Sequence, residues 1–282
     1  MAETGTLTEE TQYALLLVET LGVNRDWQDV LFDGGLTHSH SLSARGGTDK
    51  TKFSVALRYL KDEGVIVFDD YELFSANFKL DTKLSDRLSF QLTMNPSHSN
   101  RRRVPTSIHN TLRQSPWLPV FHTEESLQFI DRESYPDVGV GDYFWEDHLI
   151  ELDLDGDGDD ARPRTTSNAN PLGQNAERNQ VEWNTKLLTR GKFKYKLGKG
   201  LTVSTSVGVT REERRRERYD GVLWHHTLAD RAEYNLQNRL STRIINDNLI
   251  NYNTTVNNDH EIGALLGPVS YTHLTLPTIY SV

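Results

Sequence analysis

Residues 52–60 read K-F-S-V-A-L-R-Y-L, and this stretch decides the fold class. Every second side chain is apolar, so Phe53, Val55 and Leu57 point to one side of an extended chain, while Lys52 and Ser54 point to the other. Such alternation is typical of a β-strand with one apolar face. The pattern recurs through most of the chain, at residues 37–45, 71–83, 88–94, 181–197, 201–210, 239–245, 249–256 and 260–267. The sequence therefore predicts an all-β, antiparallel protein.

Alternation alone leaves a soluble sandwich and a transmembrane barrel open, because strands of both have one apolar face. The connections favour the barrel. Those near residues 46–50, 84–87, 198–200 and 246–248 are short, whereas about 96–180 and 212–238 are long. Alternating short turns and long loops are typical of an outer-membrane barrel, with the short turns periplasmic and the long loops extracellular. A face carrying Lys192, Lys194 and Lys196 also suits a watery bore, because unpaired lysines are costly to bury.

Composition excludes several classes of protein. A formal charge of −9 argues against a general nucleic-acid binder, and the absence of cysteine rules out a disulfide framework. Residues 1–10 are polar and acidic, and the apolar run 14–18 is too short to span a bilayer as a helix. Without a signal peptide at Met1, the protein either stays inside the cell or begins further upstream. No nucleotide loop, nucleophile elbow or zinc-protease signature is present, so we expect no enzyme.

Several separated motifs carry a family resemblance. They are D-W-Q-D-V-L-F at 26–32, H-S-L-S-A-R-G-G-T-D-K-T-K-F at 40–53, A-L-R-Y-L-K-D-E-G-V-I at 56–66, N-F-K-L-D-T-K-L-S-D-R-L at 77–88, N-A-N-P-L at 168–172 and H-E-I-G-A-L-L-G at 260–267. In this order they closely resemble the SusC/RagA family of TonB-linked outer-membrane proteins, from about residue 24 to 267.

This resemblance implies an energy-coupled importer of glycans or peptides in the Gram-negative outer membrane. It also implies three kinds of partner: the TonB energy-coupling complex, a SusD-like surface lipoprotein and outer-membrane lipid. Residues 1–33 would be the end of a plug domain and its junction with the barrel, and residues 34–268 part of the barrel. Because a signal peptide, most of the plug and the later strands are missing from this pattern, we expect the chain to be a piece of a longer receptor.

The last residues, V-S-Y-T-H-L-T-L-P-T-I-Y-S-V at 269–282, resemble one reading frame of a sequencing-library adapter. The alternative is an ordinary strand, since Tyr271, His273 and Thr275 alternate with apolar neighbours. We expect the adapter, and thus a natural sequence that stops near Pro268.

An acidic stretch, L-D-L-D-G-D-G-D-D, occupies residues 152–160. Asp153, Asp155, Asp157 and Gly158 match the first half of an EF-hand loop, but Arg164 stands where the bidentate Glu is required. With Asp160 they form the shorter pattern D-x-D-x-D-G-x-D of other extracellular calcium loops. The candidate metal ligands are therefore Asp153, Asp155, Asp157 and Asp160, with calcium as the only cofactor considered. The alternative is a solvated acidic turn without an ion.

Three tryptophans in the expected external loops are candidates for stacking on a sugar: Trp117, Trp145 and Trp224. Exposed loop aromatics more often pack within their own loop or meet a partner subunit. His38 and His40 share a strand face but lack a recognisable third zinc ligand, so we expect a structural role.

Two functions remain. The first is a nutrient import receptor, of which this chain supplies part of the wall and external loops. The second is a calcium-stabilised surface protein that binds glycans or mediates adhesion without transport.

Overall fold

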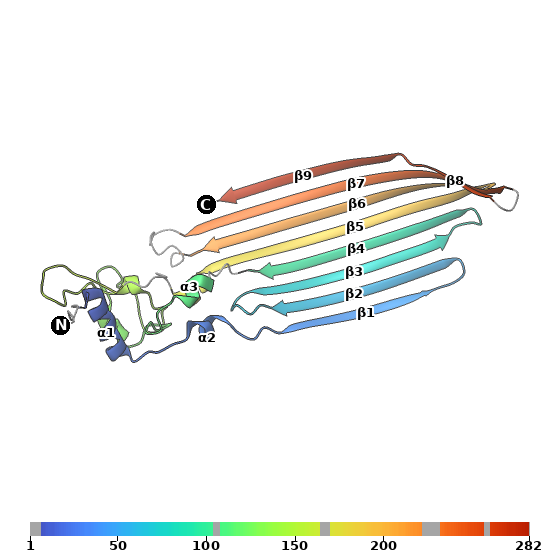
Figure 1. The fold of residues 1–282 in the computed structure, drawn as a ribbon. Helices are drawn as coiled ribbons and strands as arrows, with labels where there is room; N and C mark the ends of the chain where they lie inside the picture. The colour runs from blue at the N-terminus through green and yellow to red at the C-terminus, as the bar shows by residue number, and fades with distance from the viewer. Residues whose placement is uncertain (1–6, 104–107, 164–169, 222–231, 257–259, 282) are drawn as a thin grey trace.

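The computed structural model describes residues 7–103, 108–163, 170–221, 232–256 and 260–281. Nine long strands form one antiparallel sheet, and a smaller helical module lies beyond one end of it (Figure 1). The strands are β1 (Thr37–Gly47), β2 (Thr51–Glu63), β3 (Asp70–Lys83), β4 (Leu88–Arg102), β5 (Arg178–Gly198), β6 (Leu201–Asp220), β7 (Glu233–Val256), β8 (His260–Leu266) and β9 (Val269–Ser281). The predicted antiparallel β class is confirmed.

The sheet is open, with its strands in sequence order from β1 to β8. The last strands, β8 and β9, pair with successive parts of β7: Ile250 is opposite Leu266, and Asp247 is opposite Val269. They therefore lie end to end as one strand that is interrupted at Gly267 and Pro268. The residues assigned to an adapter thus form a strand here, and their origin stays a prediction.

Connections of two kinds alternate along the sheet. Short turns join β1 to β2, β3 to β4 and β5 to β6 at the end away from the helical module, and the wider connections lie at the other end (Figure 1). The tightest turn places Gly198, Lys199 and Gly200 at φ of 103°, 49° and 81°. A Cβ on Gly200 would lie 1.8 Å from the carbonyl oxygen of Asn253, so this position requires glycine. The predicted alternation of short turns and long loops is confirmed at these sites.

The prediction of a turn at residues 246–248 is wrong. Residues 246–248 lie inside β7, opposite Val207, Ser206 and Thr205 of β6, so the two strands expected at 239–245 and 249–256 are one. An Asn-Asp-Asn sequence is typical of a turn, but here its side chains bond across strands. The charged loop expected at 212–238 is also shorter, because β6 continues to Asp220 and β7 begins at Glu233.

The long loop is shorter than the expected range of about 96–180, because β4 continues to Arg102 and β5 begins at Arg178. It contains α3 (Ile108–Leu112), the 3₁₀ helices Ser126–Phe129 and Glu146–His148, and α4 (Pro171–Glu177). The loop has a hydrophobic core, which the sequence did not indicate. That core is shared with α1 (Glu9–Leu21) and α2 (Trp27–Leu31). Its buried members are Tyr13, Leu17, Trp27, Leu118, Val120, Phe129, Phe144 and Leu149.

We call residues 7–33 together with the described residues of 108–177 the loop module. Its first helix begins after Thr8, whose side chain accepts from the Thr11 amide, and ends at Gly22 in the left-handed region. The Trp27 indole donates to the carbonyl of Ser115 at 3.0 Å and so ties α2 to the long loop. The assignment of residues 1–33 to a plug junction stays a prediction.

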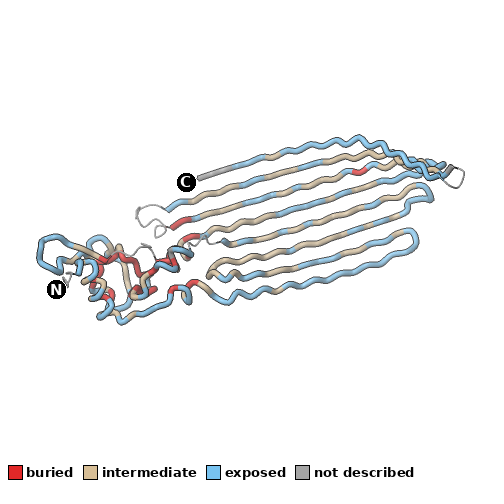
Figure 2. Tube along the Cα trace, viewed as in Figure 1, coloured by how far each residue is buried: buried red, intermediate tan, exposed pale blue. Residues whose placement is uncertain are grey.

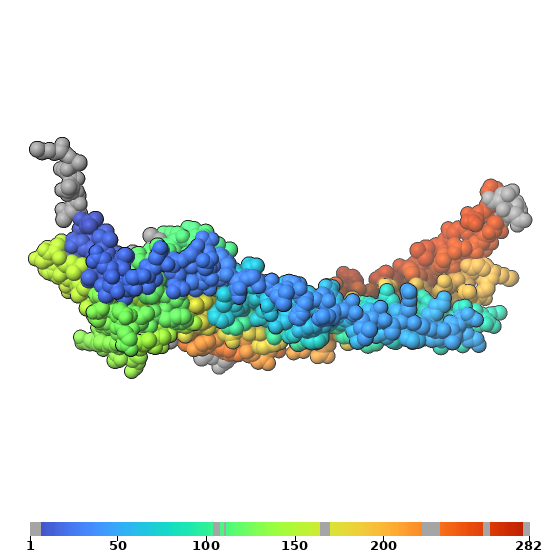
Figure 3. All heavy atoms as spheres, turned by 90° about the horizontal axis from the view of Figure 1, so that it is seen from below, coloured from blue at the N-terminus to red at the C-terminus, as the bar shows by residue number. Residues whose placement is uncertain are grey.

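Burial is divided sharply between the two parts. Every buried hydrophobic residue of the described chain lies in the loop module, whereas the strands are exposed or half-buried along most of their length (Figure 2). The molecule is correspondingly elongated, with the loop module at one end of the sheet (Figure 3). No second sheet covers the strands among the described residues. Within the same residues, no helix combines the length and the hydropathy needed to cross a membrane.

Candidate functional site

One face of the sheet is apolar, and we call it the apolar face. The register places Val55, Phe78 and Met94 in one row across β2, β3 and β4. Aromatic pairs lie on the same face: the ring centroids of Phe90 and Phe193 are 4.7 Å apart. These side chains are not covered by protein, since Leu42 is 70% exposed and Phe193 is 46% exposed. A large uncovered apolar surface of this kind requires a non-aqueous neighbour.

The apolar face contains a band without charged residues. On β6 it runs from Leu201 to Val209, and the first charge on that face is Arg211. On β2 it runs from Thr51 to Tyr59, and Lys61 follows. A tilted transmembrane strand needs about 9–11 residues to cross the hydrocarbon core. The charge-free band is therefore long enough to cross the hydrocarbon core of a bilayer.

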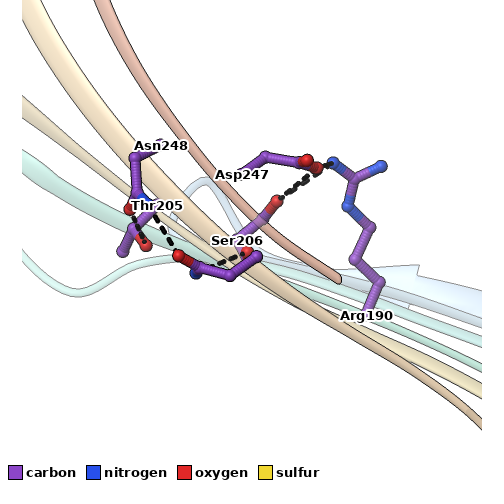
Figure 4. Close-up of polar contacts among 6 residues, drawn as sticks. Arg190, Thr205, Ser206, Asp247 and Asn248 are labelled. Carbon is purple, nitrogen blue, oxygen red and sulfur yellow. Dashed lines mark hydrogen bonds and ion pairs between the residues drawn. The ribbon is translucent and has the colours of Figure 1, made fainter. Parts of the chain in front are cut away.

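The opposite face, which we call the polar face, is lined by Ser, Thr, Asn and basic residues. Three of its residues connect neighbouring strands (Figure 4). The Arg190 Nη2 donates to Asp247 Oδ2 at 2.7 Å and to Ser206 Oγ at 3.0 Å, and Ser206 Oγ donates to the same carboxylate at 3.3 Å. Ser206 is only 4% exposed. This cluster holds β5, β6 and β7 in register.

A second polar chain occupies the apolar face directly behind that cluster (Figure 4). Thr205 Oγ1 donates to Asn248 Oδ1 at 2.7 Å, and the Asn248 amide donates to Asn246 Oδ1 at 2.6 Å. The Asn246 amide in turn donates to the Ser206 carbonyl at 3.1 Å. Because each amide has a partner, the polar trio 246–248 can continue a strand where hydrophobic neighbours surround it.

Two hollows of the polar face follow the strands one after the other. A hollow of about 840 Å³ lies near the short turns and is lined by Arg45, Lys52 and Lys79 among others. A second, of about 490 Å³, lies nearer the loop module and is lined by Arg58 and Lys186 among others.

At the loop end of the sheet, oppositely charged residues pair across strands and along β6. Arg178 forms two hydrogen bonds with the fully buried Asp220, and Arg218 also pairs with Asp220. Arg216 donates to Glu182 at 2.7 Å. These pairs explain why the charged sequence 211–220 continues β6 rather than forming a loop.

The acidic stretch gathers on the surface of the loop module. Ligand atoms of Asp153, Asp155 and Asp157 lie within 4.8 Å of one another and of Glu9, whereas Asp160 is not part of the group. Glu9 Oε1 accepts from the amides of Leu154 at 2.8 Å and Asp155 at 3.1 Å. Glu9 could not be recognised as a candidate from the sequence, because it lies on α1, far from the loop along the chain. Carboxylate oxygens are the ligands that calcium prefers, and calcium binding stays a prediction.

The tryptophan candidates have different surroundings. Trp145 is 3% exposed, so its ring faces are not presented to solvent, and Trp117 packs partly buried against the core of the loop module. Trp224 lies outside the described residues. Burial of Trp145 agrees with the packing alternative, and sugar contacts of these residues stay predictions.

Histidines occur in two settings. His38 and His40 pack edge to face at 5.5 Å, and His40 stacks on Tyr59 at 6.4 Å, in an aromatic cluster on the strands. No third metal ligand joins them among the described residues. A second pair was not anticipated from the sequence: His122 and His148 are buried in the loop module. The pKa of each is lowered to about 4, chiefly by burial, and for His122 the neighbouring His148 contributes to the shift.

Parts of this chain resemble known proteins. No protein-family model matches it. The TonB-dependent receptor SusC of Bacteroides thetaiotaomicron is 28% identical over 109 residues, which are 38% of this chain and 11% of that receptor. The TonB-dependent receptor P26 of Formosa agariphila is 23% identical over 108 residues, again 38% of this chain and 11% of the relative. The chain thus spans about a tenth of the curated relatives that it matches.

Solved structures agree in fold. The RagAB peptide transporter superposes with a TM-score of 0.63 at 14% identity, over 92% of this chain and 27% of that chain. The RagAB peptide importer in its open-open state gives 0.62 at 13% identity, over 99% of this chain and 33% of that chain. The resemblance to SusC/RagA-type receptors is confirmed, and with it the outer-membrane β-barrel class. The sheet of this chain is open and superposes on part of such a structure.

Proposed function

We propose that this chain forms part of the barrel wall and external loops of a receptor that imports a nutrient across the outer membrane. The observation that carries the proposal is the single-layer sheet with an apolar face that contains a charge-free band on one side and a polar, basic face on the other. Such a sheet suits lipid outside and a watery bore inside. The similarity to TonB-dependent receptors supports the same function.

Orientation follows from the connections. Short turns in outer-membrane barrels are periplasmic, so the turns at 48–50, 84–87 and 199–200 would face the periplasm and the loop module the medium. In this arrangement a SusD-like lipoprotein would approach the loop module, and the TonB complex would act from the periplasmic side on a plug. The receptor binds and passes a glycan or peptide and performs no chemistry on it.

Limited proteolysis of cells that express the full-length receptor tests this orientation. Trypsin added to intact cells should cut within the long loop, where Arg113, Arg132 and Arg162 lie, and leave the turn at 84–87 intact until the outer membrane is permeabilised. Cleavage of the long loop only after permeabilisation would contradict the orientation. Import itself should disappear when the TonB complex is deleted.

A second candidate function is a calcium-stabilised surface module that binds glycans without transport. The approach of Glu9 to Asp153, Asp155 and Asp157 favours it, because a carboxylate from a separate helix would let an ion fix the loop to α1. Uptake that persists without TonB, or a receptor that binds glycan without importing it, would favour this alternative.

A further inference from the structure

The polar face is strongly basic although the whole chain carries a formal charge of −9. At the level of the charge-free band, basic side chains recur on β1, β2, β3 and β5, and the acidic residues that share this part of the face are fewer: Asp81, Asp247 and Glu212, which lies opposite Lys186. We call these basic residues the cationic track: Arg45, Lys52, Arg58, Lys79, Lys186, Arg190, Lys192 and Lys194. The excess of positive charge is therefore confined to the face that would line the bore.

Most of the track has no ionic partner. Within the described chain, Arg190 pairs with Asp247, and the other track residues form no ion pair. Asp81 accepts a hydrogen bond from the Gln91 amide at 2.9 Å rather than pairing with a lysine. Like charges held along one wall repel one another, and an anion that enters the bore relieves this repulsion. The track is thus arranged to receive negative charge.

The track runs along the strands rather than around one level. The hollow nearer the loop module is bordered by Arg58 and Lys186, and the hollow nearer the short turns by Arg45, Lys52 and Lys79. Lys192 and Lys194 lie opposite Gln91 and Ser89 on the neighbouring strand and extend the same path. A ligand moving from one end of the sheet to the other would remain beside basic groups throughout.

Between the basic groups the hollows are lined by small polar side chains. Those are Ser41, Ser54, Ser75, Asn77, Asn95, Ser97, Gln91 and Thr93. Hydroxyls and amides both donate and accept hydrogen bonds, as the hydroxyls of a sugar do. Large apolar side chains, which would receive the side chains of a peptide, project mainly to the other face. The lining therefore fits a hydroxyl-rich ligand better than a peptide.

From these observations we infer that the transported substrate is an anionic oligosaccharide, with repeated carboxylate or sulfate groups that follow the cationic track. This inference rests on the proposed function and narrows its substrate class. The basic side chains would attract and guide the anionic groups, and the serine and asparagine side chains would bond the hydroxyls. Selectivity would then arise from long-range charge as well as contact, so it would weaken with salt.

Binding to the purified full-length receptor tests the inference. The probes are fluorescent hexagalacturonate, neutral maltohexaose and a hexaglutamate peptide. We expect hexagalacturonate to bind about tenfold more tightly than either of the others near 50 mM salt, and the preference to vanish near 500 mM. Changing Lys192→Gln and Lys194→Gln together should weaken hexagalacturonate binding about tenfold. The matched control is Lys61→Gln, on the other face and already paired with Glu63, which should leave binding unchanged.

Each other outcome contradicts the inference. Equal binding of the neutral and anionic sugars, or binding of neither, would overturn it. Stronger binding of hexaglutamate would show that the track serves acidic peptides. The double change could instead lower the melting temperature of the receptor and leave hexagalacturonate binding intact. The cationic track would then pair with acidic residues of the receptor itself, not with a substrate. TonB-dependent uptake that persists in any of these cases would leave the proposed function standing.

Discussion

His122 and His148 share a hydrogen bond inside the loop module, with 3.0 Å between His122 Nε2 and His148 Nδ1. Both rings are buried, at 1% and 6% exposure, and His122 Nδ1 lies 3.0 Å from Ser126 Oγ. The pair joins the segment after Val120 to the 3₁₀ turn at Glu146–His148, and Asp142, Asp147, Arg132 and Tyr135 are the ionisable groups around it. Neutral imidazoles can sustain this bond, because one nitrogen donates and the other accepts.

The loop module should lose stability in acid. The pKa of each histidine is lowered to about 4 in the folded state and lies near 6.5 when exposed. Above pH 6.5 both states are neutral and stability is full; as the pH falls from 6.5 towards 4, the unfolded state takes up protons first. We expect a loss on the order of 2 kcal/mol for each histidine by pH 5. Protease resistance of the long loop in the intact receptor, followed against pH, measures it.

A double change of His122→Gln and His148→Gln provides the control for that experiment. This variant should lose most of the pH dependence of loop-module stability between pH 4 and 6.5, and it should be less stable at neutral pH. An unchanged pH profile in this variant would exclude the histidine pair as the cause.

Tyr13 should tolerate loss of its hydroxyl but not of its ring. The side chain is fully buried, its hydroxyl oxygen has no hydrogen-bond partner among the described residues, and burial raises the pKa of the phenol to about 12. Tyr13→Phe removes an unsatisfied polar group, so the melting temperature of the loop module should stay the same or rise. Tyr13→Ala should cost about 3–5 kcal/mol through the cavity it leaves beside Phe129. Destabilisation by Tyr13→Phe would show that the hydroxyl is bonded.

Neighbouring positions on β6 should respond in opposite ways to the same substitution. Val203 lies on the apolar face and Ser204 on the polar face. Val203→Arg would place a charge against lipid, towards one edge of the charge-free band, and should destabilise the full-length barrel by about 1–2 kcal/mol, as measured by urea unfolding in liposomes. Ser204→Arg should cost little, because its side chain reaches water. Equal effects of the two changes would contradict the assignment of the faces.

Calcium should stabilise the contact between α1 and the acidic loop. If Glu9, Asp153, Asp155 and Asp157 hold the ion, about 1 mM calcium should raise the protease resistance of the loop module, and a chelator should reverse this. Glu9→Gln should remove the response, whereas Glu10→Gln, the adjacent residue on α1, should retain it. A calcium response that survives Glu9→Gln would assign the ligands to the loop alone.

Local patterns in the sequence were sufficient to predict the fold class. Alternation around Phe53 and Leu92, and the glycines at 198 and 200, specify strands and a tight turn through interactions between near neighbours. The motifs at 26–32 and 40–66 were also sufficient for the resemblance to SusC/RagA-type receptors. Asp153, Asp155 and Asp157 could be proposed together because they are adjacent along the chain.

Only the tertiary structure decided features that depend on distant residues. The segment 246–248 has the composition of a turn, yet Asn246 and Asn248 continue a strand because β6 supplies their partners. Glu9 reaches the acidic loop only because Tyr13 and Leu17, on the same helix, are buried against the long loop. Propensity acts between neighbours in sequence, whereas cross-strand bonds and hydrophobic burial act between neighbours in space, and those contacts set strand length and site composition here.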